Sequence, residues 1–258
     1  MTRMRSLFAE GNRTLWIIGA IAFLVGGLAA APASLLASIA KAGDPSLEIG
    51  AAEGTVWRGA FVDAAHDGIY LGRISYRLNP IGLLSGRLLS DAEASGGALS
   101  GRGKISIGRN AIELVGVDAR FNLAAIRRYT IFGLRYQGAA SFRAEKVILS
   151  KNKCEVAGVE IATNALDPLA RKWSGEGLPL KGGAHCADGA LVLTLAGENR
   201  EGSVTLEATV APDLNYAMTV KAAPRRKELS AALRAAGFEG DNDALAFRAA
   251  GRLKGLTS

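Results

Sequence analysis

The feature that most constrains this chain is a long apolar run near its N-terminus. No Asp, Glu, Lys or Arg occurs at residues 14–40, where Leu, Ile, Ala, Gly, Val and Phe dominate. A hydrocarbon core about 30 Å thick needs about 20 apolar residues in a helix, so this run is long enough to cross a bilayer. The sequence therefore predicts a transmembrane anchor at 14–40, a short tail at 1–13 and an extramembrane domain at 41–258.

The residues before the run predict its orientation. Arg3, Arg5 and Arg13 precede it against a single acid, Glu10. Basic residues favour the cytoplasmic side, so we expect a cytoplasmic tail and an exported domain. Trp16 lies near the cytoplasmic end, where an indole favours the membrane interface.

A cleaved signal peptide is the alternative interpretation of the same run. Its core at 15–28 has signal-peptide length, and Ala29-Ala30-Ala31 resembles a cleavage site of small residues. However, Pro32 follows directly and the uncharged run continues to residue 40, which favours an uncleaved anchor. Both interpretations export the remainder of the chain.

The exported part has the pattern of antiparallel strands. Apolar and polar residues alternate with a period near two, and 32 glycines supply tight turns and bulges. This pattern predicts an all-β, mainly antiparallel meander with short helices at 167–173 and 226–236. Residues 81–89 fit either a further strand or a short turn. The segments with strand character are 54–59, 69–78, 117–123, 142–149, 156–161, 191–195, 204–210, 216–220 and 244–253.

Two cysteines, Cys154 and Cys186, lie in the exported part. In an oxidising compartment the simplest expectation is a disulfide. A metal site that uses His185 beside Cys186 is the alternative. It lacks a fourth nearby ligand and any C-x-x-C spacing, so we expect a disulfide and no metal.

The sequence offers little for catalysis or for nucleic-acid binding. Only His66 and His185 are available as histidines, and no nucleophile elbow, zinc-protease motif or phosphate-binding loop occurs. The net charge of +7 is spread along strands without interleaved aromatic residues. We therefore expect no enzyme, no cofactor and no nucleic-acid partner.

An ordered set of short motifs runs through most of the chain. Gly54-Thr55-Val56-Trp57-Arg58-Gly59 comes first, and Tyr76-Arg77-Leu78-Asn79-Pro80 follows. With the anchor before them and the cysteines after them, these motifs resemble the type II secretion system protein N family (general secretion pathway protein N). The structural motif residues are Gly54, Thr55, Trp57, Gly59, Tyr76, Arg77 and Pro80.

The resemblance implies a bitopic inner-membrane protein with a periplasmic β-rich domain. It implies a non-catalytic accessory or structural subunit of a type II secretion system, whose partners are other subunits of that system. The family is also similar to AsmA-like proteins, whose curved sheets have an apolar groove and are in some cases linked to lipid transport.

The alternative function is therefore a lipid-binding or lipid-transporting envelope protein. In that case one face of the sheet would stay apolar and open. A simpler structural explanation is that the same residues pack against the opposite part of the sheet. The residues of that face are Val117, Phe121, Leu191, Leu193, Val204 and Leu206.

Overall fold

The computed structural model describes residues 15–20, 22–23, 26–126, 130–131, 134–135, 137–241 and 243–252. Its main element is one 14-stranded sheet in which every strand runs antiparallel to its neighbours. The strands, in spatial order, are β1 (Leu47–Gly54), β2 (Arg58–His66), β3 (Ile69–Asn79), β4 (Leu88–Gly96), β5 (Leu99–Ile107), β6 (Ala111–Asn122), β9 (Ala139–Ser150), β10 (Lys153–Thr163), β11 (Leu180–Ala187), β12 (Ala190–Asn199), β13 (Gly202–Val210), β14 (Asn215–Pro224), β16 (Ala244–Arg252) and β15 (Glu239–Asp241).

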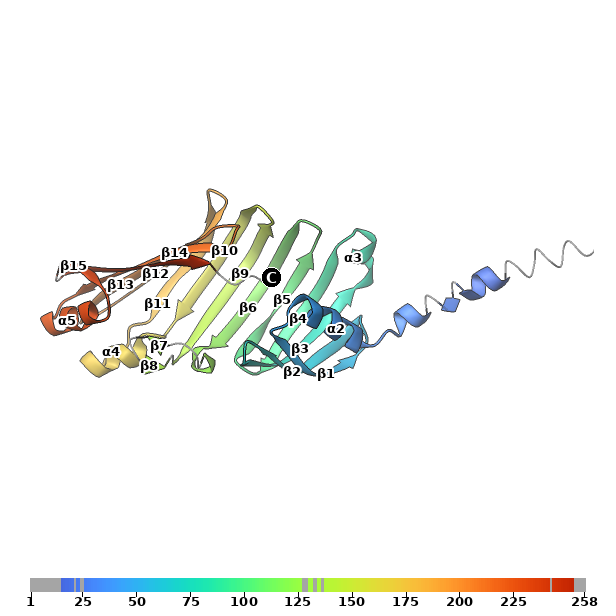
Figure 1. The fold of residues 1–258 in the computed structure, drawn as a ribbon, viewed down its shortest axis with the longest axis horizontal. Helices are drawn as coiled ribbons and strands as arrows, with labels where there is room; N and C mark the ends of the chain where they lie inside the picture. Colours follow the sequence, from blue (N-terminus) through green and yellow to red (C-terminus); the bar gives the residue numbers. More distant parts are fainter. Residues whose placement is uncertain are drawn as a thin grey trace, which may run out of the picture.

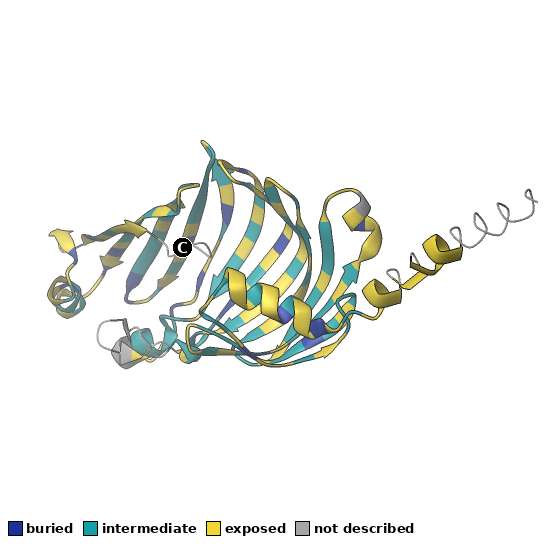
Figure 2. Ribbon diagram, turned by 45° about the vertical axis from the view of Figure 1, so that its right-hand side comes forward, coloured by how far each residue is buried: buried dark blue, intermediate teal, exposed yellow. Residues whose placement is uncertain are grey.

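Spatial order follows chain order except at the last two strands, so the predicted meander is confirmed. Figures 1 and 2 show one long curved layer, with α2 near its first strands and α4 and α5 near its last. The short strands β7 and β8 form a separate pair. The remaining elements are α2 (Ala33–Gly43), α3 (Pro80–Leu84), the 3-10 turn η1 (Leu123–Ala125), β7 (Thr130–Ile131), β8 (Leu134–Arg135), α4 (Asp167–Ser174) and α5 (Lys227–Ala235).

Asp-Gly turns explain two of the tight connections. Asp67 and Gly68 between β2 and β3 have φ values of 54° and 75°, and Asp188 and Gly189 between β11 and β12 have 50° and 75°. Positive φ at both central residues defines the type I′ turn, whose twist matches that of the paired strands. Asp-Gly between two strands is the sequence signal for a turn of this type.

The strand register separates an apolar face from a polar face. Partner residues across an antiparallel pair point to the same side, so apolar side chains from β5 to β16 share one side of the sheet. A bulge at Gly116, with φ of 60°, keeps Leu114 and Val117 on that side despite their odd spacing. We call this side the apolar face; it includes Leu99, Ile105, Leu114, Val117, Phe121, Phe142, Val147, Ile161, Leu191, Leu193, Leu195, Val204, Leu206, Val220 and Phe247.

The polar face carries a row of alternating charge. Successive strands β4, β5, β6, β9 and β10 place an acid opposite a base at every step of this row. Directly opposed unlike charges each favour the observed register by a few tenths of a kcal/mol, about 0.2–1. The five residues of this row are Glu93, Arg102, Asp118, Arg143 and Glu160.

The sheet encloses little core. Under α4, Leu166 and Ala170 pack against a cluster of Leu178, Leu180 and Leu195. Leu245 lies in a second cluster near the C-terminal end and is the bulkiest of the fully buried side chains among the described residues.

Apolar side chains on the sheet stay partly exposed in this single layer. Leu193, Val204 and Leu206 pack partly against the α4 cluster, while Val117 and Phe121 stay half-buried on the curved sheet. The apolar face is therefore packed at its α4 end, while Val117 and Phe121 belong to neither core cluster of the described residues.

The N-terminal segment differs from one continuous helix over 14–40. Residues 15–20 and 26–29 are helical, but Pro32 adopts extended geometry and bridges to Thr55. Beyond this break α2 packs on β1 and β2, with Ala33 and Ala37 buried, so it belongs to the sheet domain. In the described part of the chain, we find no helix with the length and apolar character needed to cross a membrane. The predicted tail at 1–13 lies outside the described residues.

Candidate functional site

The turn between β1 and β2 holds the N-terminal segment against the sheet. The Trp57 indole N–H donates to the Leu28 carbonyl at 2.9 Å, and the Val56 amide donates to the Ala31 carbonyl at 2.9 Å. The Pro32–Thr55 bridge completes the contact. We call residues 28–32 and 54–59 the junction.

Two glycines allow the chain to pass closely at this turn. Gly54 has φ of 88°, and a Cβ there would strike the Arg58 backbone. A Cβ on Gly59 would strike the Glu53 carbonyl oxygen and lie 2.7 Å from the Tyr76 hydroxyl oxygen. That hydroxyl donates to the Thr55 carbonyl at 2.9 Å, so the space of the missing side chain is used by a hydrogen bond that closes the turn.

The second motif continues the junction toward α3. The Leu78 amide donates to the Trp57 carbonyl at 2.8 Å, which ties the end of β3 to the turn. Asn79 then caps α3, because its side chain accepts the Ile81 amide at 2.9 Å and Pro80 occupies the first helical position. The two motifs therefore form one continuous structure.

Burial affects the chemistry of Tyr76. It raises the pKa of the phenol, so the hydroxyl stays protonated and remains a donor at neutral pH. The ring also contacts Phe61 at a centroid distance of 5.1 Å. Tyr76 thus packs on one side and donates on the other.

The far end of α2 is fixed by a polar cluster. The Asp44 carboxylate accepts from the amide and hydroxyl of Ser46 and lies 2.9 Å from His66 Nε2. The Ser46 hydrogen bond holds the pKa of Asp44 below its usual value, and His66 adds to this. Lys41 Nζ donates to the Ile49 carbonyl at 2.9 Å. These bonds fasten α2 to β1 and β2.

The predicted motif residues lie in this region as one connected set, and Trp57 is a half-buried anchor within it. Arg58 and Arg77 face each other across β2 and β3. No sequence pattern predicted that Leu28, Ala31 and Asp44 contact the sheet. Their contacts join residues 22 to 29 positions apart, and no local periodicity signals such a contact.

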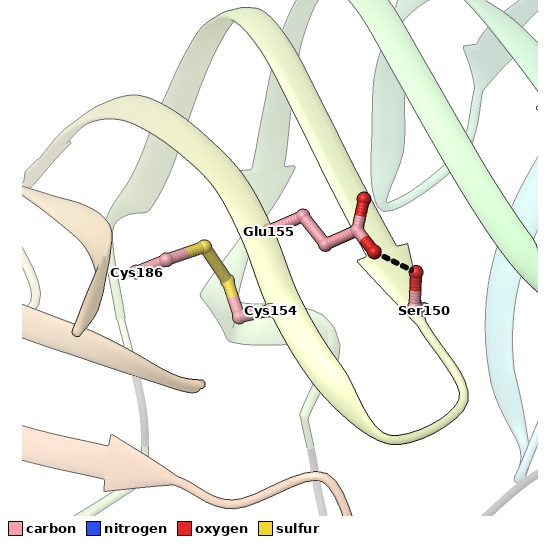
Figure 3. Close-up of a disulfide and its surroundings, with 4 residues drawn as sticks. All are labelled: Ser150, Cys154, Glu155 and Cys186. Atoms are coloured by element: carbon pink, nitrogen blue, oxygen red, sulfur yellow. Dashed lines mark hydrogen bonds between the residues drawn. A yellow bond between two sulfur atoms is a disulfide. The ribbon is translucent and has the colours of Figure 1, made fainter. Parts of the chain in front are cut away.

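The predicted disulfide between Cys154 and Cys186 is confirmed (Figure 3). It joins the start of β10 to the end of β11, beyond their outermost ladder pair, Gly158 with His185. The Cys154 amide also donates to the Gly189 carbonyl at 2.7 Å. These strands are connected through α4 rather than by a hairpin, so the disulfide closes their open end.

A hydrogen bond next to the disulfide orients Glu155. Ser150 donates its hydroxyl to this carboxylate at 2.7 Å (Figure 3), which lowers the pKa of Glu155. Among the residues that the structure describes, His, Cys, Asp and Glu form no group of three able to hold a metal ion.

Comparison with known proteins gives one match. No curated protein and no solved structure matches the chain. The family model described as type II secretion system (T2SS), protein N matches residues 45–248, which begin just before β1 and extend into β16. The match covers well over half of the chain and nearly the whole sheet, and the chain therefore belongs to the type II secretion system protein N family.

Proposed function

We propose that this protein is a non-catalytic accessory subunit of a type II secretion system, anchored in the inner membrane with its sheet in the periplasm. The family match over residues 45–248 carries this proposal. The sheet would act as a rigid periplasmic platform that contacts other subunits of the system.

Two features support anchoring by the N-terminal segment. Its side chains Leu15, Trp16 and Phe23 are 68%, 75% and 79% exposed, and the segment projects away from the sheet in Figure 1. The hydrogen bonds at Leu28 and Ala31 would transmit the position of this segment to the sheet. Large apolar side chains directed away from a folded domain are typical of membrane or partner contacts.

The disulfide supports the periplasmic assignment. Structural disulfides persist in the bacterial periplasm and are rare in the cytoplasm. Cys154 is only 8% exposed, so the bond is protected from reductants. It is thus typical of a structural bond in an exported domain.

The outer strands differ in their ability to recruit a partner strand. β15 has three residues, two of them acidic, which blunts that edge. β1 has eight residues and lies beside the junction, so it offers the longer edge for strand addition. We therefore expect a secretion partner at β1, close to the membrane.

The direct test is site-specific photocrosslinking in cells with an intact secretion system. A photoreactive residue at Ala51 of β1 should give adducts with a secretion subunit, whereas one at Glu239 of β15 should not. Deletion of the gene should also reduce export of the secreted substrates. Adducts equal at both positions, together with unchanged export, would reject the proposal.

The apolar face supports lipid binding as a second candidate function. The face continues from β5 to β16, and its residues Ile107 and Ile112 are each 44% exposed. Lipid should co-purify with the detergent-solubilised protein and be lost in Phe121→Asp. The control Thr205→Asp on the polar face should retain it. Equal lipid content in both variants would argue against this candidate.

A further inference from the structure

We propose that α3 and two neighbouring arginines form a second membrane contact, which rests on the lipid headgroups beside the N-terminal segment. We call this set the α3 patch: Arg58, Arg77, Ile81 and Leu83. The ligand is the surface of a bilayer that contains anionic phospholipid. The inference rests on the proposed anchoring, because the anchor would bring α3 to the bilayer.

The apolar part of the patch is held out in solvent by a rigid turn. Ile81 and Leu83 are 71% and 46% exposed. Between them Gly82 packs so closely on β4 that a Cβ would lie 2.8 Å from Leu89 Cγ. Side chains on either side of Gly82 are therefore displayed outward, where their exposure costs free energy in water.

Several hydrogen bonds fix this turn. The Ser85 hydroxyl donates to the Gly82 carbonyl at 2.7 Å, and the Arg87 amide donates to the same oxygen at 3.0 Å. The Asn79 cap fixes the other end of α3. A turn with both ends bonded presents Ile81 and Leu83 in one arrangement rather than letting them collapse onto the sheet.

The basic part of the patch contains two arginines beside one acid, Asp91, which lies opposite Arg77 on β4. Arg58 and Arg77 are opposite each other on β2 and β3, and both are exposed. No ion pair joins either of them to another described residue, whereas Arg73 on the same strand pairs with Glu53 at 2.7 Å. Like charges directly opposed disfavour the pairing of their strands, and a phosphate between them would reverse that effect.

The location of the patch indicates a membrane rather than a soluble ligand. Leu78 links β3 to Trp57, and Trp57 binds the carbonyl of Leu28 in the N-terminal segment. Figures 1 and 2 show α3 at the same end of the sheet as that segment. Apolar side chains next to arginines are the usual composition of a surface that binds at an anionic interface.

The test uses the full chain in vesicles of phosphatidylcholine with phosphatidylglycerol. A photoreactive benzoylphenylalanine replaces Ile81 in one variant and Tyr70 in a control. Tyr70 is 49% exposed at the other end of β3, against 71% for Ile81, so both positions are accessible but they differ in location. We expect phospholipid adducts, detected by mass spectrometry, from position 81 only.

A second measurement tests the arginines. Arg58→Gln with Arg77→Gln should lower the ratio of phosphatidylglycerol to phosphatidylcholine in the adducts at position 81 by at least about five-fold, the effect of one arginine near an anionic surface. The control Arg248→Gln, an exposed arginine on β16, should leave the ratio unchanged.

Carbonate extraction of the same vesicles separates the anchor from the patch. If the protein resists extraction but position 81 gives no more lipid adduct than position 70, the patch is refuted and the anchor stands. If carbonate releases the protein although position 81 reacts with lipid, the anchor is refuted and the patch stands. Adducts of position 81 with protein in native membranes, in place of lipid, would also overturn the inference.

Discussion

Removal of the disulfide should destabilise the sheet by several kcal/mol. The perturbation is the double variant Cys154→Ala with Cys186→Ala. Alanine is preferred to serine because Cys154 is 8% exposed, and a serine hydroxyl there would need a hydrogen-bond partner. The variant removes the covalent closure of β10 and β11 without adding a polar group.

The magnitude follows from the loop that the bond closes. The cysteines are 32 positions apart. In the chain-entropy model a loop of this length stabilises the native state by about 3.7 kcal/mol at 25 °C. Two features make β10 and β11 depend on the disulfide. The ladder between these strands ends at Gly158, and at their other end they are joined through α4 rather than by a hairpin.

The assay is urea unfolding of the full chain in mild detergent, followed by circular dichroism. With a slope of about 2–3 kcal/mol per molar urea, the midpoint should fall by about 1–2 M. Reduction of the unmodified protein should produce the same shift, and the double variant should not respond to the reductant. A midpoint within a few tenths of a molar of the unmodified protein would refute the loop argument.

Three further outcomes follow from the junction and the polar clusters. Gly59→Ala should lower stability by about 1–3 kcal/mol in thermal unfolding, because its Cβ would strike the Glu53 carbonyl oxygen and lie 2.7 Å from the Tyr76 hydroxyl oxygen; an unchanged melting temperature would contradict these contacts. Tyr76→Phe should cost about 0.5–1.5 kcal/mol, since the Thr55 carbonyl loses its donor, and a variant as stable as the parent would count against the bond. Acidification should also destabilise the sheet, because the pKa values of Asp44 and Glu155 are lower in the folded state than in the unfolded state. The contribution of these two carboxylates to stability is complete above the unfolded pKa values near 4 and is lost as the pH falls through the folded values. Asp44→Asn should flatten this acid response in pH-dependent unfolding, and an identical pH profile would exclude Asp44 as its source.

Local pattern was sufficient to predict most strands. The alternation at 204–210 and 216–220 became β13 and β14, and the helices expected at 167–173 and 226–236 correspond to α4 and α5 within a residue. Period-two alternation survives because each strand is solvated on one face and apolar on the other. The disulfide was predicted from the number of cysteines and from the expected oxidising compartment, not from geometry.

Contacts between distant segments could not be predicted in this way. The long run without charged residues placed residues 33–40 in the anchor, but α2 packs on the sheet because Pro32 turns the chain toward Thr55. Pattern also showed that one face is apolar without showing whether anything covers it. The hydrogen bond from Trp57 to Leu28 depends on the turn geometry set by Gly54 and Gly59, which appears only once the strands are paired.

The nearly sequential strand order has a consequence for biogenesis. Apart from the separate pair β7 and β8, each strand from β2 to β14 pairs with a strand formed by earlier residues, so each can add to a template that already exists. The stability of such a sheet is approximately a sum of contacts between neighbouring strands, so folding can begin at one pair of strands and spread along the sheet. A chain that is exported from its N-terminus can therefore assemble strand by strand as it emerges. Cys154 can pair with Cys186 only after β11 has emerged. Formation of the disulfide would therefore show that the sheet has assembled as far as β11.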